Sequence, residues 1–299
     1  MKKCLHMSKK SSNFAHKMKQ RGLYIVLLLL MAALLHAEQH TLRAEADRPG
    51  YGTGTNVLTR GMIQWETGFE AMHIPGMHLV TLPTTLFRFG LHERAELRVE
   101  YAGGLLINDH PDSNPETNDE HTYYCDPLYI GTKLMLWGGS DEPQLRWIPR
   151  TSVMLNIGVP ITRSVAKRMP ISGNADLLFE NDITDWLTIQ YEFGAHWIEW
   201  APMPDFFATL GMNFAATENI AFFVENYNYF DCDNNIELIG YKTAYNVNLD
   251  FGMTYMPHPR VQLDLYAGFN CYATEPLLKG PKNQCFLGLG VTWLLHAPK

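Results

Sequence analysis

Apolar and polar residues alternate along most of the chain after residue 60. Within residues 61–71, Trp65 and Phe69 fall on one side of an extended backbone, while Glu66 and Glu70 fall on the other side. A period of two indicates a β-strand whose faces meet different surroundings, because successive side chains of a strand point in opposite directions. We therefore predict an all-β fold built from amphipathic strands.

Twelve segments show this pattern, and most of them are 9–14 residues long. Strands of globular proteins are shorter, about five or six residues on average. A tilted strand that crosses a bilayer needs roughly 9–11 residues. Segment length thus favours membrane strands, which we place at residues 61–72, 77–91, 94–104, 126–137, 147–158, 174–182, 185–197, 204–214, 219–229, 242–255, 260–271 and 284–295.

The connections between these segments alternate in length. Short connections lie at 92–93, 183–184, 215–218 and 256–259, and most of the others are longer, at 105–125, 159–173, 198–203, 230–241 and 272–283. An even strand number with alternating short and long connections is typical of an outer-membrane barrel, whose short turns face the periplasm. We predict a closed antiparallel transmembrane β-barrel of about twelve strands. A soluble β-sandwich is the alternative.

Charge is unevenly distributed along the chain. Residues 1–22 hold seven Lys or Arg residues and no acidic residue, residues 23–35 are apolar, and Ala37 follows. This order is typical of a secretory signal peptide. The alternative is an uncleaved anchor, although 13 apolar residues are fewer than the roughly 20 of a spanning helix. Removal of residues 1–37 would change the formal net charge from −7 to −14.

These features divide the chain into three parts. We predict a signal peptide over residues 1–37, a periplasmic or plug-like segment over 38–60 and the outer-membrane barrel over 61–295. The middle part has glycines at alternate positions from Gly50 to Gly54. No Lys-Ser or Lys-Thr pair directly follows them, so they do not form a phosphate-binding loop. We expect a flexible or plugging segment.

Short glycine-rich motifs recur throughout the part of the chain after the signal peptide. The stretch ADRPGYGTG begins at residue 46, QWETG at 64, RFGL at 88, NIGVP at 156 and GLGV at 288. Together they resemble a family of outer-membrane barrels named after a MetA pathway of phenol degradation. The resemblance covers almost all of residues 46–293. It implies transport or channel activity and does not identify a substrate.

The polar faces of the predicted strands carry many charged residues. An Arg or Lys that faces lipid at the midplane costs about 2–4 kcal/mol, so we place these side chains in the lumen. There they either set ion selectivity and line a solute path, or pair with one another and fill a narrow barrel. The candidates are Glu66, Glu70, Arg88, Glu96, Arg98, Glu100, Lys133, Glu192, Glu225, Asp250 and Asp264.

Four cysteines lie in the predicted barrel, all on its outer side in this topology. An exported protein can form disulfides. Cys271 and Cys285 flank one loop and are the expected pair, and Cys125 and Cys232 would form the second. Three connectivities exist in principle. The chain has no CxxC motif and no evident ligand cluster, so we predict no metal site and no cofactor.

Composition and motifs exclude several classes of function. The isoelectric point near 5.9 argues against a nucleic-acid partner, because proteins that bind nucleic acid are usually basic. Neither HExxH nor GxSxG occurs, and Ser152 on a polar face has no evident histidine partner. We therefore do not predict an enzyme.

Together these features predict an outer-membrane channel or transporter for small solutes, hydrophobic or aromatic ones among them. A structural or adhesive barrel with a closed lumen is the first alternative, and an outer-membrane lipid hydrolase is the second. The expected partners are outer-membrane lipid, the barrel-assembly machinery during insertion and a small-molecule solute.

Overall fold

The computed structural model describes residues 43–109, 121–138, 147–161, 171–197, 204–231, 244–273 and 284–296. The predicted signal peptide lies outside these residues. Within the described ranges, no helix is long and apolar enough to cross a membrane. The strands are β1 Ile63–Ile74, β2 Met77–His92, β3 Ala95–Asn108, β4 His121–Cys125, β5 Leu128–Trp137, β6 Arg150–Val159, β7 Ser172–Thr184, β8 Leu187–Trp197, β9 Asp205–Ala215, β10 Ile220–Asp231, β11 Ala244–His258, β12 Val261–Ala273 and β13 Cys285–His296.

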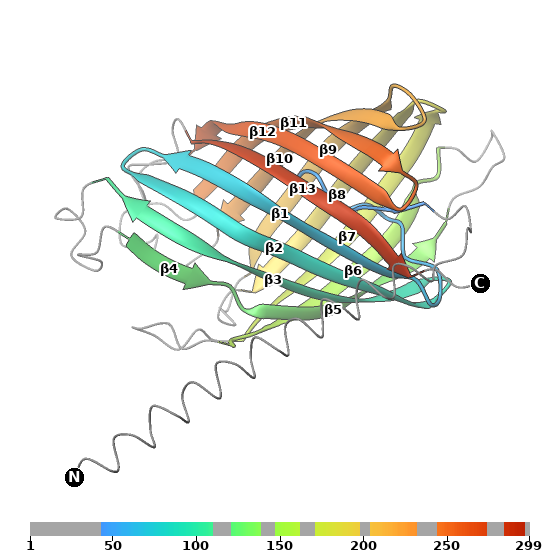
Figure 1. Ribbon diagram of the computed structural model, residues 1–299, viewed down its shortest axis with the longest axis horizontal. Coiled ribbons are helices and arrows are strands. Elements are labelled where there is room, and N and C mark those ends of the chain that lie inside the picture. Colours follow the sequence, from blue (N-terminus) through green and yellow to red (C-terminus); the bar gives the residue numbers. More distant parts are fainter. Residues whose placement is uncertain are drawn as a thin grey trace, which may run out of the picture.

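The strands form one closed antiparallel ring (Figure 1). β1 pairs with β2 on one side and with β13, the last strand, on the other. The order then runs from β13 back to β5, and β3 joins β5 to β2. Lipid offers no hydrogen-bond partner to an unpaired strand edge, and closure gives every described strand except β4 a neighbour on each side. The predicted closed antiparallel barrel is confirmed.

β4 and β5 share one position in this ring. β5 pairs with residues 95–100 of β3, and β4 pairs with residues 103–107 of the same strand. Pro127 lies between them, and its missing N–H interrupts the ladder. The ring therefore has twelve positions. The prediction of a loop over 105–125 is wrong at both ends, because β3 continues to Asn108 and β4 covers His121–Cys125. These residues satisfy their backbone groups by pairing with each other's strand, and the hydrophobic pattern gives no sign of that pairing.

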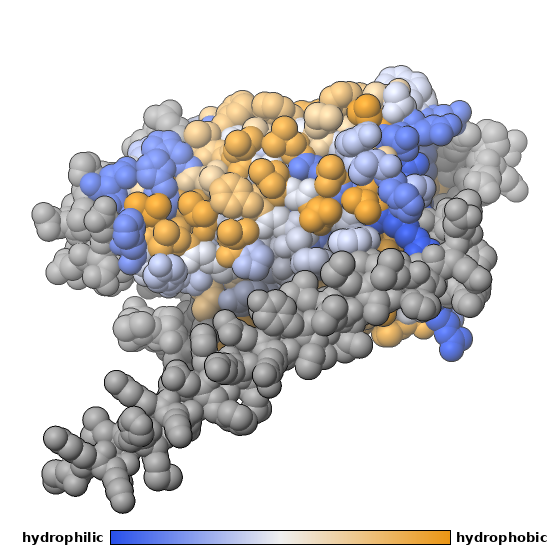
Figure 2. All heavy atoms as spheres, viewed as in Figure 1, coloured by the Kyte–Doolittle hydropathy of each residue, from blue (hydrophilic) through white to orange (hydrophobic). Residues whose placement is uncertain are grey.

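Large apolar side chains cover the outside of the barrel. Leu265, Leu287 and Leu289 are 48%, 50% and 51% exposed, whereas Arg88 and Lys133 are fully buried. Figure 2 shows hydrophobic residues gathered over the middle of the wall and hydrophilic residues toward the two ends. A barrel wall surrounded by lipid requires this arrangement.

Residues 43–60 lie inside the barrel, and we call them the lumen plug (Figure 1). The first leg begins among the short turns, where the Ala44 N–H donates to the Pro259 carbonyl over 2.7 Å. The second leg returns to the same end, where the Gly61 N–H donates to the Gly90 carbonyl over 2.8 Å. The lumen plug therefore enters and leaves through one mouth of the barrel. We call this the inner mouth, and the opposite end the outer mouth.

Candidate functional site

Side chains of the barrel wall accept hydrogen bonds along the whole lumen plug. A segment without regular secondary structure has N–H groups that need acceptors when it is buried. One glutamine and four glutamates of the wall supply them, over 2.8–3.1 Å. Glu45 N–H donates to Gln64, Asp47 to Glu66, Tyr51 and Gly52 to Glu225, Thr53 to Glu192 and Leu58 to Glu96.

Asp47 is bound ionically near the inner mouth. Its carboxylate accepts two hydrogen bonds of 2.9 Å from Lys133 Nζ and a further one from Arg98. Arg88 Nη1 lies 3.5 Å from the same carboxylate. Burial by itself raises the pKa of Asp47, but the three cations outweigh this effect and hold the pKa well below its usual range. Asp47 is therefore ionised over the physiological range.

The three cations are balanced by three carboxylates. Glu96 accepts hydrogen bonds from Arg88 over 2.8 and 2.9 Å and from Arg98 over 2.9 Å. Glu66 lies 3.2 Å from Arg88. All six side chains are less than a tenth exposed. We call this group the ionic anchor, and it consists of Asp47, Glu66, Arg88, Glu96, Arg98 and Lys133.

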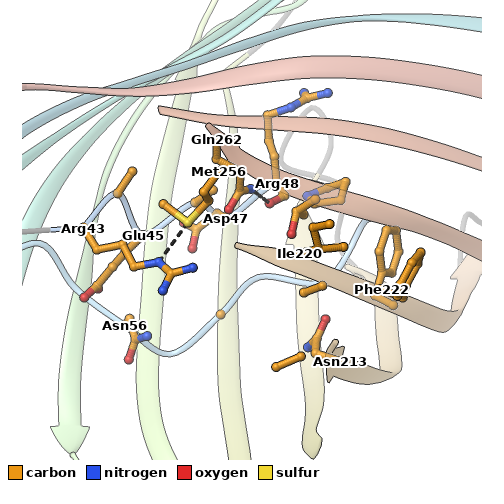
Figure 3. A pocket seen from close by; sticks show the side chains of 18 of the residues that line it. Arg43, Glu45, Asp47, Arg48, Asn56, Asn213, Ile220, Phe222, Met256 and Gln262 are labelled. Carbon is orange, nitrogen blue, oxygen red and sulfur yellow. Dashed lines mark hydrogen bonds between the residues drawn. The ribbon is translucent and has the colours of Figure 1, made fainter. Parts of the chain in front are cut away.

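Arg48 binds a second set of wall residues, on β12 and β2. Its guanidinium lies 3.4 Å from Asp264, donates to Thr84 over 3.0 Å and stands 5.7 Å from the ring of Tyr266. Gln262 Nε2 donates to the Arg48 carbonyl over 3.0 Å (Figure 3). Two consecutive residues of the lumen plug thus bind different sets of wall side chains.

The backbone N–H groups in the deepest part of the lumen plug are bound by carboxylates that have no ion-pair partner among the described residues. Glu225 accepts the N–H groups of Tyr51 and Gly52 over 2.9–3.0 Å, and Glu192 accepts that of Thr53 over 2.8 Å. A Cβ at Gly52 would lie 2.7 Å from Glu225 Oε2 and 2.9 Å from Thr209 Oγ1. Only glycine lets the backbone approach this closely, which accounts for one glycine of the motif beginning at residue 46. We call residues 50–53 the tip.

Aromatic rings surround Tyr51 at the tip. Tyr51 stacks on Tyr227 with ring centroids 4.0 Å apart and meets Phe286 edge-on at 5.6 Å. This cluster was not predicted from the sequence, because only the charged residues among the inward positions were selected. The signal that could have revealed the cluster was the presence of aromatic residues among the inward positions of the strands. The cluster consists of Phe207, Phe223, Tyr227, Tyr266 and Phe286, with Tyr51, Met72 and Tyr229 packed against it.

The second leg of the lumen plug combines polar and apolar contacts. Thr55 donates through its hydroxyl to Glu180, and its carbonyl accepts a hydrogen bond of 2.6 Å from Ser152 Oγ. Leu58 is fully buried and packs in a small cluster with Met256 and Leu294 near the inner mouth. Ser152, which the sequence analysis considered as a nucleophile, is therefore engaged in holding the lumen plug.

Cavities remain on both sides of the lumen plug. A cavity of about 400 Å³ opens near the inner mouth and is lined by Glu45, Asp47, Arg48 and the ends of β9–β11 (Figure 3). Two cavities of about 290 and 320 Å³ lie on the far side, and both are lined by Tyr51. Asp47, Arg48 and Gly52 line cavities on both sides. The lumen is thus divided by one short segment.

The charged residues selected from the sequence fall into separate groups in the structure. Five of them, Glu66, Arg88, Glu96, Arg98 and Lys133, meet in the ionic anchor. Asp264 binds Arg48, and Glu192 and Glu225 hold the tip. Asp250 is fully buried opposite Glu225, Glu70 is half-buried and accepts from Tyr266, and Glu100 is exposed toward the cavities.

Several residues of the site were not selected from the sequence. Asp47 and Arg48 belong to the motif ADRPGYGTG. The motif was recognised, but nothing in it indicated that these two side chains lie in the lumen. Asp176 and Glu180 lie on β7 at inward positions, with 1% and 7% exposure. They follow the same alternation as the selected residues and could have been found by it.

The described cysteines form no disulfide with one another. The register of β12 and β13 places Cys285 opposite Phe269, so Cys271 is its diagonal neighbour. Diagonal neighbours lie roughly 7–8 Å apart, beyond the Cα separation of about 4.4–6.8 Å in a disulfide. The expected Cys271–Cys285 bond is therefore not formed in this structure. The Cys125–Cys232 pair stays a prediction, because Cys232 lies outside the described residues.

Comparison with known proteins gives a family and a fold. The family described as "Putative MetA-pathway of phenol degradation" matches residues 46–276, a range that includes most of the lumen plug. No curated protein sequence matches the chain. An outer membrane channel from Pseudomonas putida F1 is similar in structure, with a TM-score of 0.59, 10% identity and coverage of 84% of this chain and 100% of that chain. The NanC porin has a TM-score of 0.52, 8% identity and coverage of 77% and 98%. These similarities show the fold.

Proposed function

We propose that this chain, which belongs to the family described as "Putative MetA-pathway of phenol degradation", is an outer-membrane channel closed by its lumen plug. Its solutes would be small, hydrophobic or aromatic ones among them. The inner mouth would face the periplasm, because the short turns lie there. Opening would require the lumen plug to move aside within the barrel or to leave it.

The observation that carries this proposal is the division of the lumen by one segment. Cavities of about 400 Å³ on the inner side and about 290 and 320 Å³ on the outer side share lining residues of the lumen plug. A barrel built only as a scaffold would gain by filling this space with wall side chains, since close packing stabilises a core. The wall instead carries acceptors shaped for a separate segment.

Export and membrane placement belong to the same proposal. The signal peptide over residues 1–37 would direct export, and the barrel-assembly machinery would insert the barrel. The apolar outer wall supports an outer-membrane position, with lipid as its partner. A small-molecule solute is the remaining expected partner.

The two alternatives make different demands on the same residues. A structural or adhesive barrel needs the lumen plug to be permanent. A lipid hydrolase needs an available nucleophile, whereas the Ser152 hydroxyl donates to the Thr55 carbonyl over 2.6 Å. Non-catalytic passage of solutes therefore fits the observed contacts better.

The test is the current through single folded molecules in a planar bilayer. Asp47→Ala removes the partner that Lys133 and Arg98 share, so we expect the lumen plug to be released more often and the open time to rise at least ten-fold. Glu218→Gln is the matched control, since Glu218 lines the inner cavity without binding the ionic anchor. Its current should resemble that of the unmodified protein.

The two alternatives predict other results. Molecules that fold but conduct neither before nor after Asp47→Ala would indicate a permanently closed structural barrel. Release of fatty acid from phospholipid vesicles, abolished by Ser152→Ala, would indicate a hydrolase. Folding of each variant is checked by the shift in gel mobility between boiled and unboiled samples.

A further inference from the structure

The cavity of about 290 Å³ on the outer side of the tip differs from the others in its lining, and we call it the outer chamber. Three carboxylates line it, from Glu100, Asp176 and Glu192. None of the described side chains that line it is Lys or Arg. By contrast, Arg48 and Arg98 line the neighbouring cavity of about 320 Å³.

Two carboxylates of the outer chamber, those of Asp176 and Glu192, are held in place by hydrogen bonds in which no Lys or Arg takes part. Asp176 is 1% exposed and lies 2.9 Å from His196 Nε2, and it accepts a hydrogen bond from Asn174. Glu192 is 2% exposed and uses one oxygen to accept the Thr53 N–H. Negative charge enclosed by low-dielectric walls concentrates the field in a cavity and raises the local concentration of cations.

Two further polar groups, which lie beside the tip and do not line the outer chamber, are buried without a partner among the described residues. Asp250 is fully buried opposite Glu225, and neither of its carboxylate oxygens has a hydrogen-bond partner. Thr209 lies opposite Glu192, and its hydroxyl is also unpartnered. The Asp250 carboxylate beside the tip is therefore not satisfied by the described protein groups, and a buried acceptor of this kind favours a cationic or donating ligand.

Aromatic rings complete the lining of the outer chamber. Phe207 and Tyr229 lie with centroids 4.8 Å apart, and both line the chamber with Tyr51, whose ring is held by Tyr227. Aromatic faces attract an ammonium group through their quadrupole and cover the apolar skeleton that carries it. A bare metal ion would make little use of these rings, and the described residues offer no group of three His, Cys, Asp or Glu side chains suited to a metal.

We propose that the outer chamber binds an organic ammonium ion, with the charged group among Glu100, Asp176 and Glu192 and a small apolar or aromatic skeleton against Phe207 and Tyr229. A volume of about 290 Å³ is at the lower end for ligand sites, so the ligand is small. This inference rests on the proposed function, because it treats the outer chamber as a binding site along the path of the solute. It narrows the solute class to amines.

The experiment is calorimetric titration of the folded full chain in detergent, with micelles alone as the blank. The probes are 2-phenylethylammonium, the neutral 2-phenylethanol and the anionic phenylacetate, which share a skeleton and differ in charge. We expect the ammonium to bind at least ten-fold more tightly than the alcohol, and phenylacetate not to bind. Equal affinity for the ammonium and the alcohol, or no binding of the ammonium, would overturn the inference.

Matched variants locate the binding. Glu100→Gln removes one carboxylate that forms no hydrogen bond or ion pair with the lumen plug, and it should weaken ammonium binding about ten-fold while leaving the alcohol unaffected. Phe207→Leu should weaken both probes several-fold by removing a ring. Asp185→Asn, an exposed change at the inner turn between β7 and β8, should alter neither affinity. An unchanged affinity in Glu100→Gln would place binding elsewhere and refute the site.

Binding and conduction are measured separately, so the two proposals can fail independently. A protein that binds the ammonium at Glu100 yet never conducts would retain the outer chamber and refute the channel. A protein that conducts after Asp47→Ala yet shows no preference for the ammonium would retain the channel and refute the outer chamber.

Discussion

The ionic anchor and the tip hold the same segment by different means. At the ionic anchor, three cations meet three carboxylates, and the buried charge is balanced within the protein. At the tip, Glu225 and Glu192 bind backbone N–H groups and form no ion pair with a described Lys or Arg. The comparison shows that inward charges of one barrel serve two purposes. Balanced charges fix Asp47 near the inner mouth, and carboxylates without a cation partner bind the backbone N–H groups of the tip.

Breaking the balance at the ionic anchor should have the largest effect. Asp47→Ala leaves three buried cations facing two carboxylates, and an uncompensated buried charge costs about 3–5 kcal/mol. We expect that loss to appear as release of residues 43–60 rather than unfolding of the barrel. Hydrogen exchange read by mass spectrometry should show faster exchange of the peptide spanning residues 44–58.

A second substitution separates charge balance from loss of contacts. Asp47→Ala combined with Lys133→Met restores two cations against two carboxylates, so we expect part of the protection against exchange to return. If the double variant exchanges faster than Asp47→Ala alone, the ionic anchor does not act through its charge balance.

Overpacking the tip should have the next largest effect. A Cβ at residue 52 meets Glu225, Thr209 and Gln190 at 2.7–3.0 Å, all at side-chain ends that can shift. Gly52→Ala should therefore cost about 1–3 kcal/mol and loosen the tip. Exchange should rise at residues 50–53 and remain slow around Asp47. Equal rates along the whole lumen plug would mean that the two regions are not independent.

Neutralising the acceptor at the tip should have a smaller effect. Glu225→Gln keeps one oxygen that can accept a backbone N–H and removes the charge, so we expect a loss of about 0.5–1.5 kcal/mol. The measurement is the open-channel noise of single molecules, which should increase without a change in mean conductance. Unaltered noise would indicate that Glu225 contributes nothing to holding Tyr51 and Gly52.

Lowering the pH from 7 to 4 should have the smallest effect, because the ionic anchor stays charged over this interval. The pKa of Asp47 is held below its usual range, so its contribution is present above the ordinary value of about 3.9 and is lost only as the pH falls through the lower value. Current recorded from pH 7 to pH 4 should show no opening. Opening with a midpoint near pH 6 would show that another group controls the lumen plug.

Much of the wall could be predicted from the sequence, because the two faces of each strand meet lipid and lumen. The predicted strand at 260–271 corresponds to β12, where Leu265 is outward and Asp264 is inward and buried. The short strand β4 could not be predicted in this way. Its side chains, such as the largely exposed Tyr123, show no clean alternation, and its position depends on pairing with β3.

The candidate site was predicted only in part. The sequence placed Arg88, Arg98 and Lys133 in the lumen without indicating what they bind. Their partner Asp47 comes from a segment outside the strands, and no local pattern relates residue 47 to residue 133. The same holds for Tyr51 and Tyr227, which stack although they are far apart in the chain.

The sequence by itself determined the strand pattern, the inward and outward faces and the closed barrel, because these follow from period-two alternation and from the need of every strand edge for a partner in lipid. The tertiary structure decided which charges meet and where residues 43–60 lie. Those contacts depend on the register around a closed ring and on the path of a segment that has no periodicity of its own. Long-range pairing of this kind is set by the complementarity of the two surfaces. Local patterns in the sequence do not show which distant residues meet.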